Sequence, residues 1–248
     1  MPKREINRMK IRIISAAVFL VLLTPVCFAQ EGTYLIHYAG NFSLGDSILN
    51  LTNTGSSIGL EVNTTPVPGG PVTSRRTPVD HPSSPAPQSS NGDICANVYV
   101  FSPDEQLQEC CSCFLTPNAL HSFSVRNDLI TNPLTGVVPT SVVIKLVATV
   151  AGLGPTAKVP ASSPLCNPAT AGQKDISGNP IGQPLATGLA AWGTNTHLCN
   201  MGTAVTETPF TVGQLSDGEL ARITGLCAFI QSNGSGAGLC KSCALGGQ

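Results

Sequence analysis

Cys110-Cys111-Ser112-Cys113 places three thiols within four residues, and a second group, Cys240-Lys241-Ser242-Cys243, lies near the C-terminus. Adjacent cysteines rarely bond each other without strained geometry, so Cys110 and Cys111 should take different partners. The central stretch is therefore expected to join two other segments of the chain. The sequence predicts a domain that disulfide bonds hold together.

The first 29 residues have the order of a secretory signal peptide. Basic residues come first, an apolar run extends from Ile13 to Leu23, and a small-residue site ends at Ala29. The apolar run is about half of the roughly 20 residues that a spanning helix needs, and no later segment replaces it. We expect a mature chain that begins at Gln30, does not span a membrane, and is secreted, periplasmic or displayed at the cell surface.

Acidic residues outnumber basic residues once the signal peptide is removed. The full chain has 13 basic and 14 acidic residues, of which segment 1–29 contains five and one, so 8 and 13 remain and the net charge is −5. Nucleic-acid binding normally needs a clustered basic surface, so this charge balance excludes a nucleic-acid partner. Low charge with many Ser, Thr, Asn, Gly and Pro residues instead indicates an extracellular β domain.

Composition divides the mature chain into three segments. In residues 30–65, apolar and polar residues alternate on both sides of Asn53-Thr54-Gly55, which predicts a β-hairpin. Residues 66–92 contain seven prolines among small and polar residues, as linkers and disordered loops do. Residues 93–248 should form the cysteine-stapled β-rich domain. The hairpin could pack on this domain or on a neighbouring molecule.

Strand patterns dominate the third segment. The clearest strand extends from Ser141 to Val150, where one face is apolar throughout. Further strands are expected at Ile94 to Phe101, at Leu189 to Gly193, and at Ala204 to Val212, where Pro209 indicates the edge of a sheet.

Two helices are also expected. Ser216 and Glu219 form a capping-box pattern, and apolar residues follow at helical spacing up to Asn233-Gly234, which puts Cys227 on the buried side. A serine cap, a proline and a glutamate in Ser102-Pro103-Asp104-Glu105 predict a short helix that runs into Cys110. The predicted fold class is a mainly β, sandwich-like, disulfide-stapled domain with one C-terminal α-helix and one short helix.

Nine cysteines remain after the signal peptide is removed, and an oxidising compartment should pair most of them. The disulfide candidates are Cys95, Cys110, Cys111, Cys113, Cys166, Cys199, Cys227, Cys240 and Cys243. The preferred network joins seven of them in one cluster, with Cys166 and Cys199 outside it or supplying the odd thiol. The pairing itself does not follow from the sequence.

A metal site is a more specific functional interpretation of the same cysteines. Cys110 with Cys113, and Cys240 with Cys243, have the C-x-x-C spacing of a zinc knuckle. Export and the extra cysteines beside these pairs favour structural disulfides. A reactive thiol pair would need a helix N-terminus to stabilise its thiolate, and only five residues follow Cys243. We therefore predict no metal and no cofactor, and a Cys-based metal-binding or redox protein is the alternative.

Gly45-Asp46-Ser47-Ile48 is similar to the first block of the GDSL hydrolases, which makes Ser47 a candidate nucleophile. That family also needs a C-terminal D-x-x-H dyad, and no histidine of this chain has an aspartate three residues before it. We therefore predict that the protein is not an enzyme. A serine hydrolase on Ser47 is the lesser alternative.

Several stretches resemble a group of uncharacterised exported bacterial proteins. They include the central CCSC, Thr116-Pro117-Asn118, Ala191-Trp192-Gly193-Thr194 and Lys241-Ser242-Cys243. The resemblance covers most of the mature chain apart from the proline-rich segment, and it implies export without a mechanism. The predicted function is a structural or interaction module for adhesion or surface assembly. Its partner would be a second copy of the chain or another surface component.

Overall fold

The computed structural model describes residues 31–56, 92–151, 166–178, 181–200 and 202–243. The expected signal peptide, the second arm of the expected hairpin, and the proline-rich segment up to residue 91 lie outside the described residues. The described part is mainly β, with two antiparallel sheets, four disulfide bonds and one C-terminal helix. This confirms the predicted fold class.

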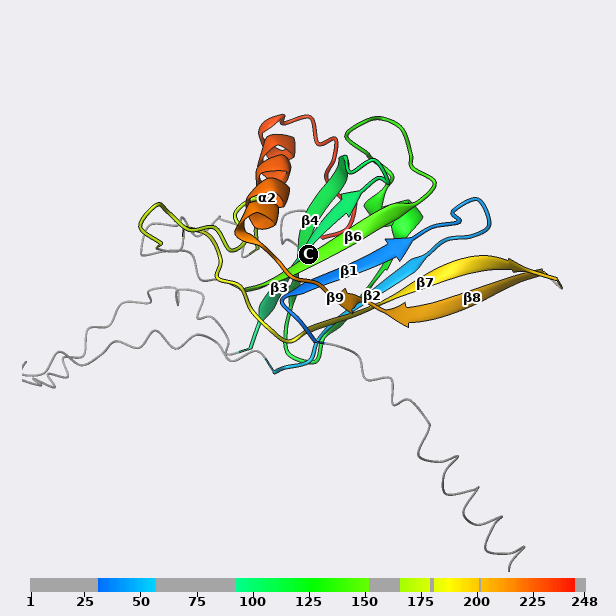
Figure 1. The fold of residues 1–248 in the computed structure, drawn as a ribbon, viewed down its shortest axis with the longest axis horizontal. Coiled ribbons are helices and arrows are strands. Elements are labelled where there is room, and N and C mark those ends of the chain that lie inside the picture. Colours follow the sequence, from blue (N-terminus) through cyan, green and yellow to red (C-terminus); the bar gives the residue numbers. More distant parts are fainter. Residues whose placement is uncertain (1–30, 57–91, 152–165, 179–180, 201, 244–248) are drawn as a thin grey trace, which may run out of the picture.

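Within the described ranges, nine strands form the two sheets (Figure 1). They are β1 (Tyr34–Ala39), β2 (Ile48–Asn53), β3 (Ile94–Phe101), β4 (Leu107–Leu115), β5 (Leu120–Ser124), β6 (Val142–Val150), β7 (Leu189–Cys199), β8 (Gly202–Pro209) and β9 (Thr211–Val212). One sheet has the strand order β4-β3-β6-β1-β9, and the other has the order β5-β2-β7-β8. Side chains from both sheets meet in one buried core.

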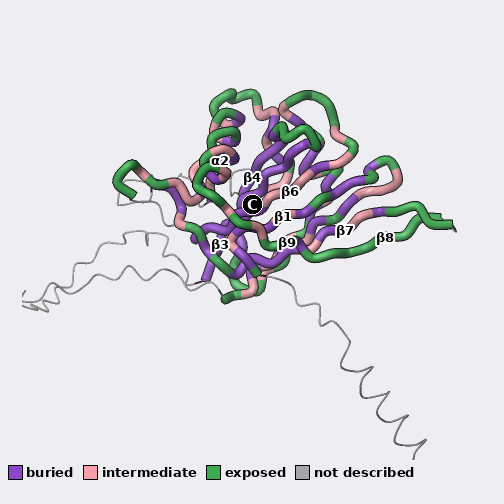
Figure 2. The backbone as a smooth tube through the Cα atoms, viewed as in Figure 1, coloured by how far each residue is buried: buried purple, intermediate pink, exposed green. Residues whose placement is uncertain are grey.

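Strand β6 shows why the sandwich forms. Val142, Ile144 and Leu146 lie on one face and join the core between the sheets. Val147 lies on the opposite face and packs in a second buried cluster with residues of the C-terminal helix. The sequence predicted one core face for this strand, and the structure covers both faces. Figure 2 shows the resulting band of buried backbone through the centre of the molecule.

The segment before the proline-rich stretch belongs to both sheets. Strand β1 pairs with β6 and β9, whereas β2 lies between β5 and β7. Residues 31–56 therefore pack within the same sandwich as the strands after residue 92. Both edges of β2 are occupied in this sheet, by β5 and by β7.

The C-terminal helix α2 (Asp217–Ser232) begins as its sequence indicated. The Ser216 hydroxyl accepts a hydrogen bond from the Glu219 N–H at 3.1 Å, which confirms the predicted N-cap. The Glu219 carboxylate does not return to the cap but binds Lys145 of β6 and Arg222. This ion-pair group joins the first turn of α2 to the sheet beneath it.

The short helix expected from Ser102 to Cys110 is wrong. The Ser102 N–H donates to the Gln106 carbonyl and the Glu105 N–H to the Ser102 carbonyl, which closes a tight connection between β3 and β4. Glu105 has a φ of 63°, in the left-handed region, which a helix could not contain. The long-range pairing of β4 with β3 overrode the local capping signal at Ser102. The short helical element of the described part is instead the π-helix η1 (Val125–Leu129).

Candidate functional site

The C-terminal tail, residues 238–243, covers the outer edge of β4. The Cys110 N–H donates to the Gly238 carbonyl at 2.8 Å, and the Ser112 N–H donates to the Cys243 carbonyl at 3.2 Å. Leu239 also forms a parallel bridge with Cys110. The tail thus satisfies main-chain groups that would otherwise be open to pairing with another chain.

Disulfide bonds hold this tail and the helix to β4. Cys110 bonds Cys227 of α2, whereas Cys111 bonds Cys240 and Cys113 bonds Cys243 in the tail. Successive side chains of a strand point to opposite faces. Cys110 therefore lies in the cluster under α2, whereas Cys111 and Cys113 lie in the core between the sheets.

One expectation about the cysteines needs correction. Cys95 does not belong to the central cluster, because it bonds Cys166 in a small separate cluster at the start of β3. Cys166 lies outside the central cluster, as expected, but in a disulfide bond. Cys199 is the free thiol among the described residues, and it is exposed.

The two C-x-x-C pairs, on which the alternative metal-site interpretation rests, do not form one set of zinc ligands in the described residues. Residues three apart on a strand point to opposite faces, so Cys110 and Cys113 cannot bind one ion. The strand conformation of β4, which the sequence assigned to a helix end, is the reason.

A different group of metal-ligating atoms does converge at the end of the tail. The ligand atoms of Cys113, His121 and Cys243 all lie within 4.8 Å of one another. His121 Nε2 lies 3.5 Å from Cys243 Sγ. Sequence reasoning missed His121 because β4 and β5 belong to different sheets, so that their spacing along the chain gave no sign of contact. The C-x-x-C pairs drew attention to the two cysteines alone.

The surroundings of this group hold the tail in place. Burial lowers the pKa of His121 below its ordinary value, although the nearby Asp128 acts in the opposite direction. Asp128 also fixes the tail: its main-chain carbonyl accepts from the Lys241 N–H at 2.9 Å, and its carboxylate accepts from the Ser242 hydroxyl at 2.8 Å. His121 therefore lies beside a firmly positioned disulfide.

Glu109 is a buried carboxyl group on the same strand. One of its oxygens accepts from the Asn132 N–H at 2.6 Å, and the other has no hydrogen-bond partner within the described part of the chain. Burial raises the pKa of Glu109 to about 7. The carboxyl group is thus protonated in mildly acidic solution and carries an uncompensated charge above neutrality.

Ser47 does not have the surroundings of a nucleophile. Its hydroxyl is 1% exposed and has no hydrogen-bond partner among the described residues. The adjacent Asp46 carboxylate accepts from the N–H groups of Ser47 and Arg126, at 2.8 and 3.0 Å, and from the Ser124 hydroxyl. Asp46 therefore fixes the junction between β2, β5 and η1, which gives the Gly-Asp-Ser stretch a structural role.

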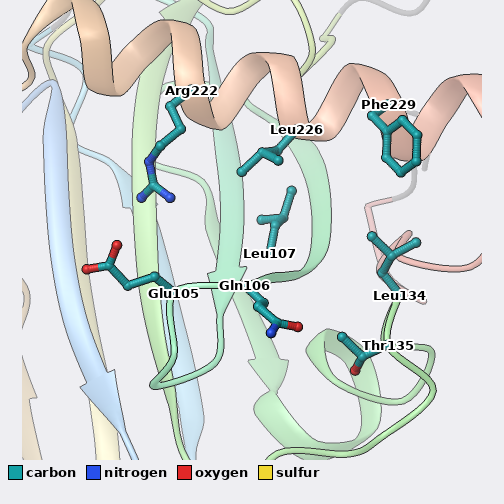
Figure 3. A pocket seen from close by; sticks show the side chains of 8 residues that line it. All are labelled: Glu105, Gln106, Leu107, Leu134, Thr135, Arg222, Leu226 and Phe229. Carbon is teal, nitrogen blue, oxygen red and sulfur yellow. The ribbon is translucent and has the colours of Figure 1, made fainter.

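An apolar hollow lies under the exposed side of α2 (Figure 3). Its volume is about 440 Å³. Figure 3 shows Arg222, Leu226 and Phe229 extending from the helix, opposite Leu107 of β4 and Leu134 of the loop between η1 and β6. Its remaining lining residues are Glu105, Gln106 and Thr135. The hollow is open at the surface, because Phe229 is half exposed.

The hairpin of β7 and β8 projects beyond the rest of its sheet (Figure 1). The pairing of β7 with β2 ends at Gly193, whereas its pairing with β8 continues to Cys199. All eight residues of β8 are exposed. Leu198 and Val205 are 72% and 64% exposed, so the projecting part presents apolar side chains to solvent.

The direction of the main-chain groups of β8 follows from one hydrogen bond. The Phe210 N–H donates to the Ala191 carbonyl at 2.9 Å, and the register between β7 and β8 is regular. Hydrogen-bonded and non-hydrogen-bonded pairs alternate along an antiparallel ladder. Thr206 and Thr208 therefore bond β7, whereas the N–H and carbonyl groups of Val205 and Glu207 point away from it.

The fold and these sites define a disulfide-stapled, two-sheet β domain with a C-terminal helix and an open strand edge. Comparisons with protein families, curated proteins and solved structures found no match. Among the residues that the structure describes, no helix has both the length and the apolar character needed to cross a bilayer.

Proposed function

We propose that this protein is an exported structural module that assembles with further copies of itself at a surface, through the outer edge of β8. Four disulfide bonds are typical of a protein that works in an oxidising compartment, which supports export. The outer edge of β8, which no described residue covers, is the observation that carries the assembly role.

The other three sheet edges differ from β8. The tail covers β4, β9 has only two residues, and β5 has five residues and passes directly into η1. Proteins that remain monomeric usually shorten, cover or charge their edge strands. Strand β8 has eight residues and a single charged side chain, Glu207. It therefore offers a long, nearly neutral edge for strand addition.

A second copy fits this edge in an antiparallel arrangement. If a two-fold axis passes through Val205, the Val205 residues of two copies face each other, and Thr203 of each copy faces Glu207 of the other. These are the positions whose main-chain groups point away from β7, so each pair can exchange both of its hydrogen bonds. No like charges meet in this register. The interface uses the same surface on both copies, as in most homodimers.

Proline at position 205 tests this pairing. Val205→Pro removes an outward N–H without removing a hydrogen bond between β7 and β8, so the fold should survive. Val205→Ala is the matched control, because it keeps the N–H. Both are made with Cys199→Ser, which prevents dimers linked through the free thiol.

Sedimentation over a range of concentrations gives the readout. We expect reversible association for the parent chain and for Val205→Ala, and monomers for Val205→Pro with an unchanged melting temperature. A parent chain that stays monomeric throughout, or a Val205→Pro variant that associates as strongly as the control, would contradict the proposal.

We assign no catalytic chemistry to this module. The burial of Ser47 supports this assignment, since a substrate could not reach its hydroxyl without rearrangement of β2. A fluorophosphonate probe should leave the folded protein unlabelled. Labelling that disappears in Ser47→Ala would favour the hydrolase instead.

A further inference from the structure

We propose that Cys113, His121 and Cys243 become a metal site when the disulfide between the two cysteines is reduced. The ligand would be Zn²⁺ or a similar divalent transition metal, because two thiolates and an imidazole are a donor set that zinc prefers. This inference is independent of assembly through β8. The C-terminal tail would then be cross-linked to the sheets in either of two ways, by a disulfide bond or through a metal ion.

The positions of the three donors suit one ion. Zinc binds thiolate sulfur at about 2.3 Å and imidazole nitrogen at about 2.0 Å, so a tetrahedral site separates sulfur from nitrogen by about 3.5 Å. His121 Nε2 already lies 3.5 Å from Cys243 Sγ. The two sulfurs must separate to about 3.8 Å, which becomes open to them once the covalent bond between them is broken. The Cys113 sulfur also needs no large movement to reach the same ion, because the ligand atoms of all three residues lie within 4.8 Å of one another.

The reductant is a dithiol, either a small molecule or a reduced protein of the thiol–disulfide exchange type. The dithiol gives two electrons and two protons to the disulfide, so that the bond between Cys113 and Cys243 breaks and two thiols form, while the dithiol closes its own disulfide. Binding of Zn²⁺ then releases the two thiol protons. His121 binds through the lone pair of Nε2. A water molecule completes the fourth position.

This disulfide is the one that a reductant reaches most easily. Cys243 is partly exposed, whereas the cysteines of the other three bridges are all buried. Thiol–disulfide exchange requires access of the attacking thiolate to a sulfur atom. After reduction the tail stays in place, because the bond between Cys111 and Cys240 and the hydrogen bonds to Asp128 remain. Cys243 is therefore kept near His121.

Cobalt binding tests the site with a direct spectroscopic signal. The mature full-length chain carrying Cys199→Ser is reduced with limiting dithiothreitol, and mass spectrometry identifies the bridge that opens. Co²⁺ is then added without the reductant. We expect about one Co²⁺ per chain, with thiolate-to-cobalt charge-transfer bands and the intense visible bands of tetrahedral Co²⁺, both of which added Zn²⁺ should remove.

Two histidine variants make the result specific. His121→Ala should weaken Co²⁺ binding by at least tenfold, and His197→Ala, on the projecting hairpin, should leave it unchanged. His121→Gln serves as a second variant if His121→Ala does not fold. Opening of another bridge before Cys113–Cys243, a reduced protein that takes up no Co²⁺, or equal Co²⁺ affinity in the His121 and His197 variants would overturn the inference.

Discussion

Gly193 of β7 lies directly against the ring of His37 of β1. A Cβ atom on Gly193 would come within 2.2 Å of His37 Nε2. The ring cannot easily move away, because it is buried and stacks on Phe210 with ring centres 4.7 Å apart. This close approach fixes the separation of the two sheets where β1 crosses β7.

Gly193→Ala should therefore destabilise the sandwich by about 2 to 3 kcal/mol, as overpacked core positions do. Chemical denaturation measures the free energy of unfolding. Gly218→Ala is the matched control, because a Cβ there meets nothing within 4 Å and the position lies in α2. It should leave stability unchanged or raise it slightly. Equal stability of Gly193→Ala and the parent chain would show that His37 moves freely.

Glu109 should make the stability fall as the solution becomes more alkaline. Its folded pKa of about 7 lies above the ordinary value of 4.5, so the folded state binds more protons than the unfolded state between these two values. Stability is then highest below the unfolded pKa and is lost as the pH rises through the folded pKa. The slope is about −1.4 kcal/mol per pH unit at most, and the dependence ends above the folded pKa.

Glu109→Gln removes this ionisation and keeps an oxygen for the Asn132 N–H. Denaturation at pH 5 and pH 8 should show that the parent chain loses on the order of 2 to 3 kcal/mol more than the variant between these two conditions. The same loss in both proteins would assign the pH dependence to other groups. His37 would not account for such a loss, because burial lowers its pKa and its contribution has the opposite sign.

Ser216→Ala should cost about 1 kcal/mol of stability, because the Glu219 N–H at the start of α2 would lose its capping partner. Ser232→Ala at the other end of α2 is the control, since the Ser232 hydroxyl only returns to the Phe229 carbonyl of its own helix. The Cys110–Cys227 bond should hold the helix on the sheet in both variants. Thermal melts that coincide for the two variants would argue against the cap.

The sequence predicted those elements whose signals are local. The apolar face of β6 and the cap of α2 each lie within one segment, and both were found where expected. The cap at Ser102 was equally local, but the pairing of β4 with β3 is non-local and overrode it. A propensity signal decides only when no stronger tertiary contact opposes it.

The candidate sites depended almost wholly on non-local contacts. The pairing of Cys95 with Cys166 joins positions 71 residues apart, and the group of Cys113, His121 and Cys243 draws on both sheets and the tail. For Cys110 and Cys113, the outcome depended on whether the segment forms a helix or a strand. Residues three apart share a face of a helix but lie on opposite faces of a strand. In the sequence, only Pro209 indicated that β8 lies at the edge of a sheet.

The distance between two copies of Cys199 tests assembly through β8 most directly. Cys199 pairs with Gly202, three residues from Val205, and is free and exposed. In the antiparallel pair, six residues at about 3.4 Å and three strand spacings at about 4.8 Å separate the two Cys199 Cα atoms, which gives about 25 Å.

Nitroxide labels on Cys199 make this distance measurable by double electron–electron resonance. We expect a narrow distribution centred near 25 Å, allowing for the length of the labels, and its loss in Val205→Pro. A distribution at a clearly different distance that survives Val205→Pro, or no dipolar coupling at concentrations of several hundred micromolar, would contradict the account.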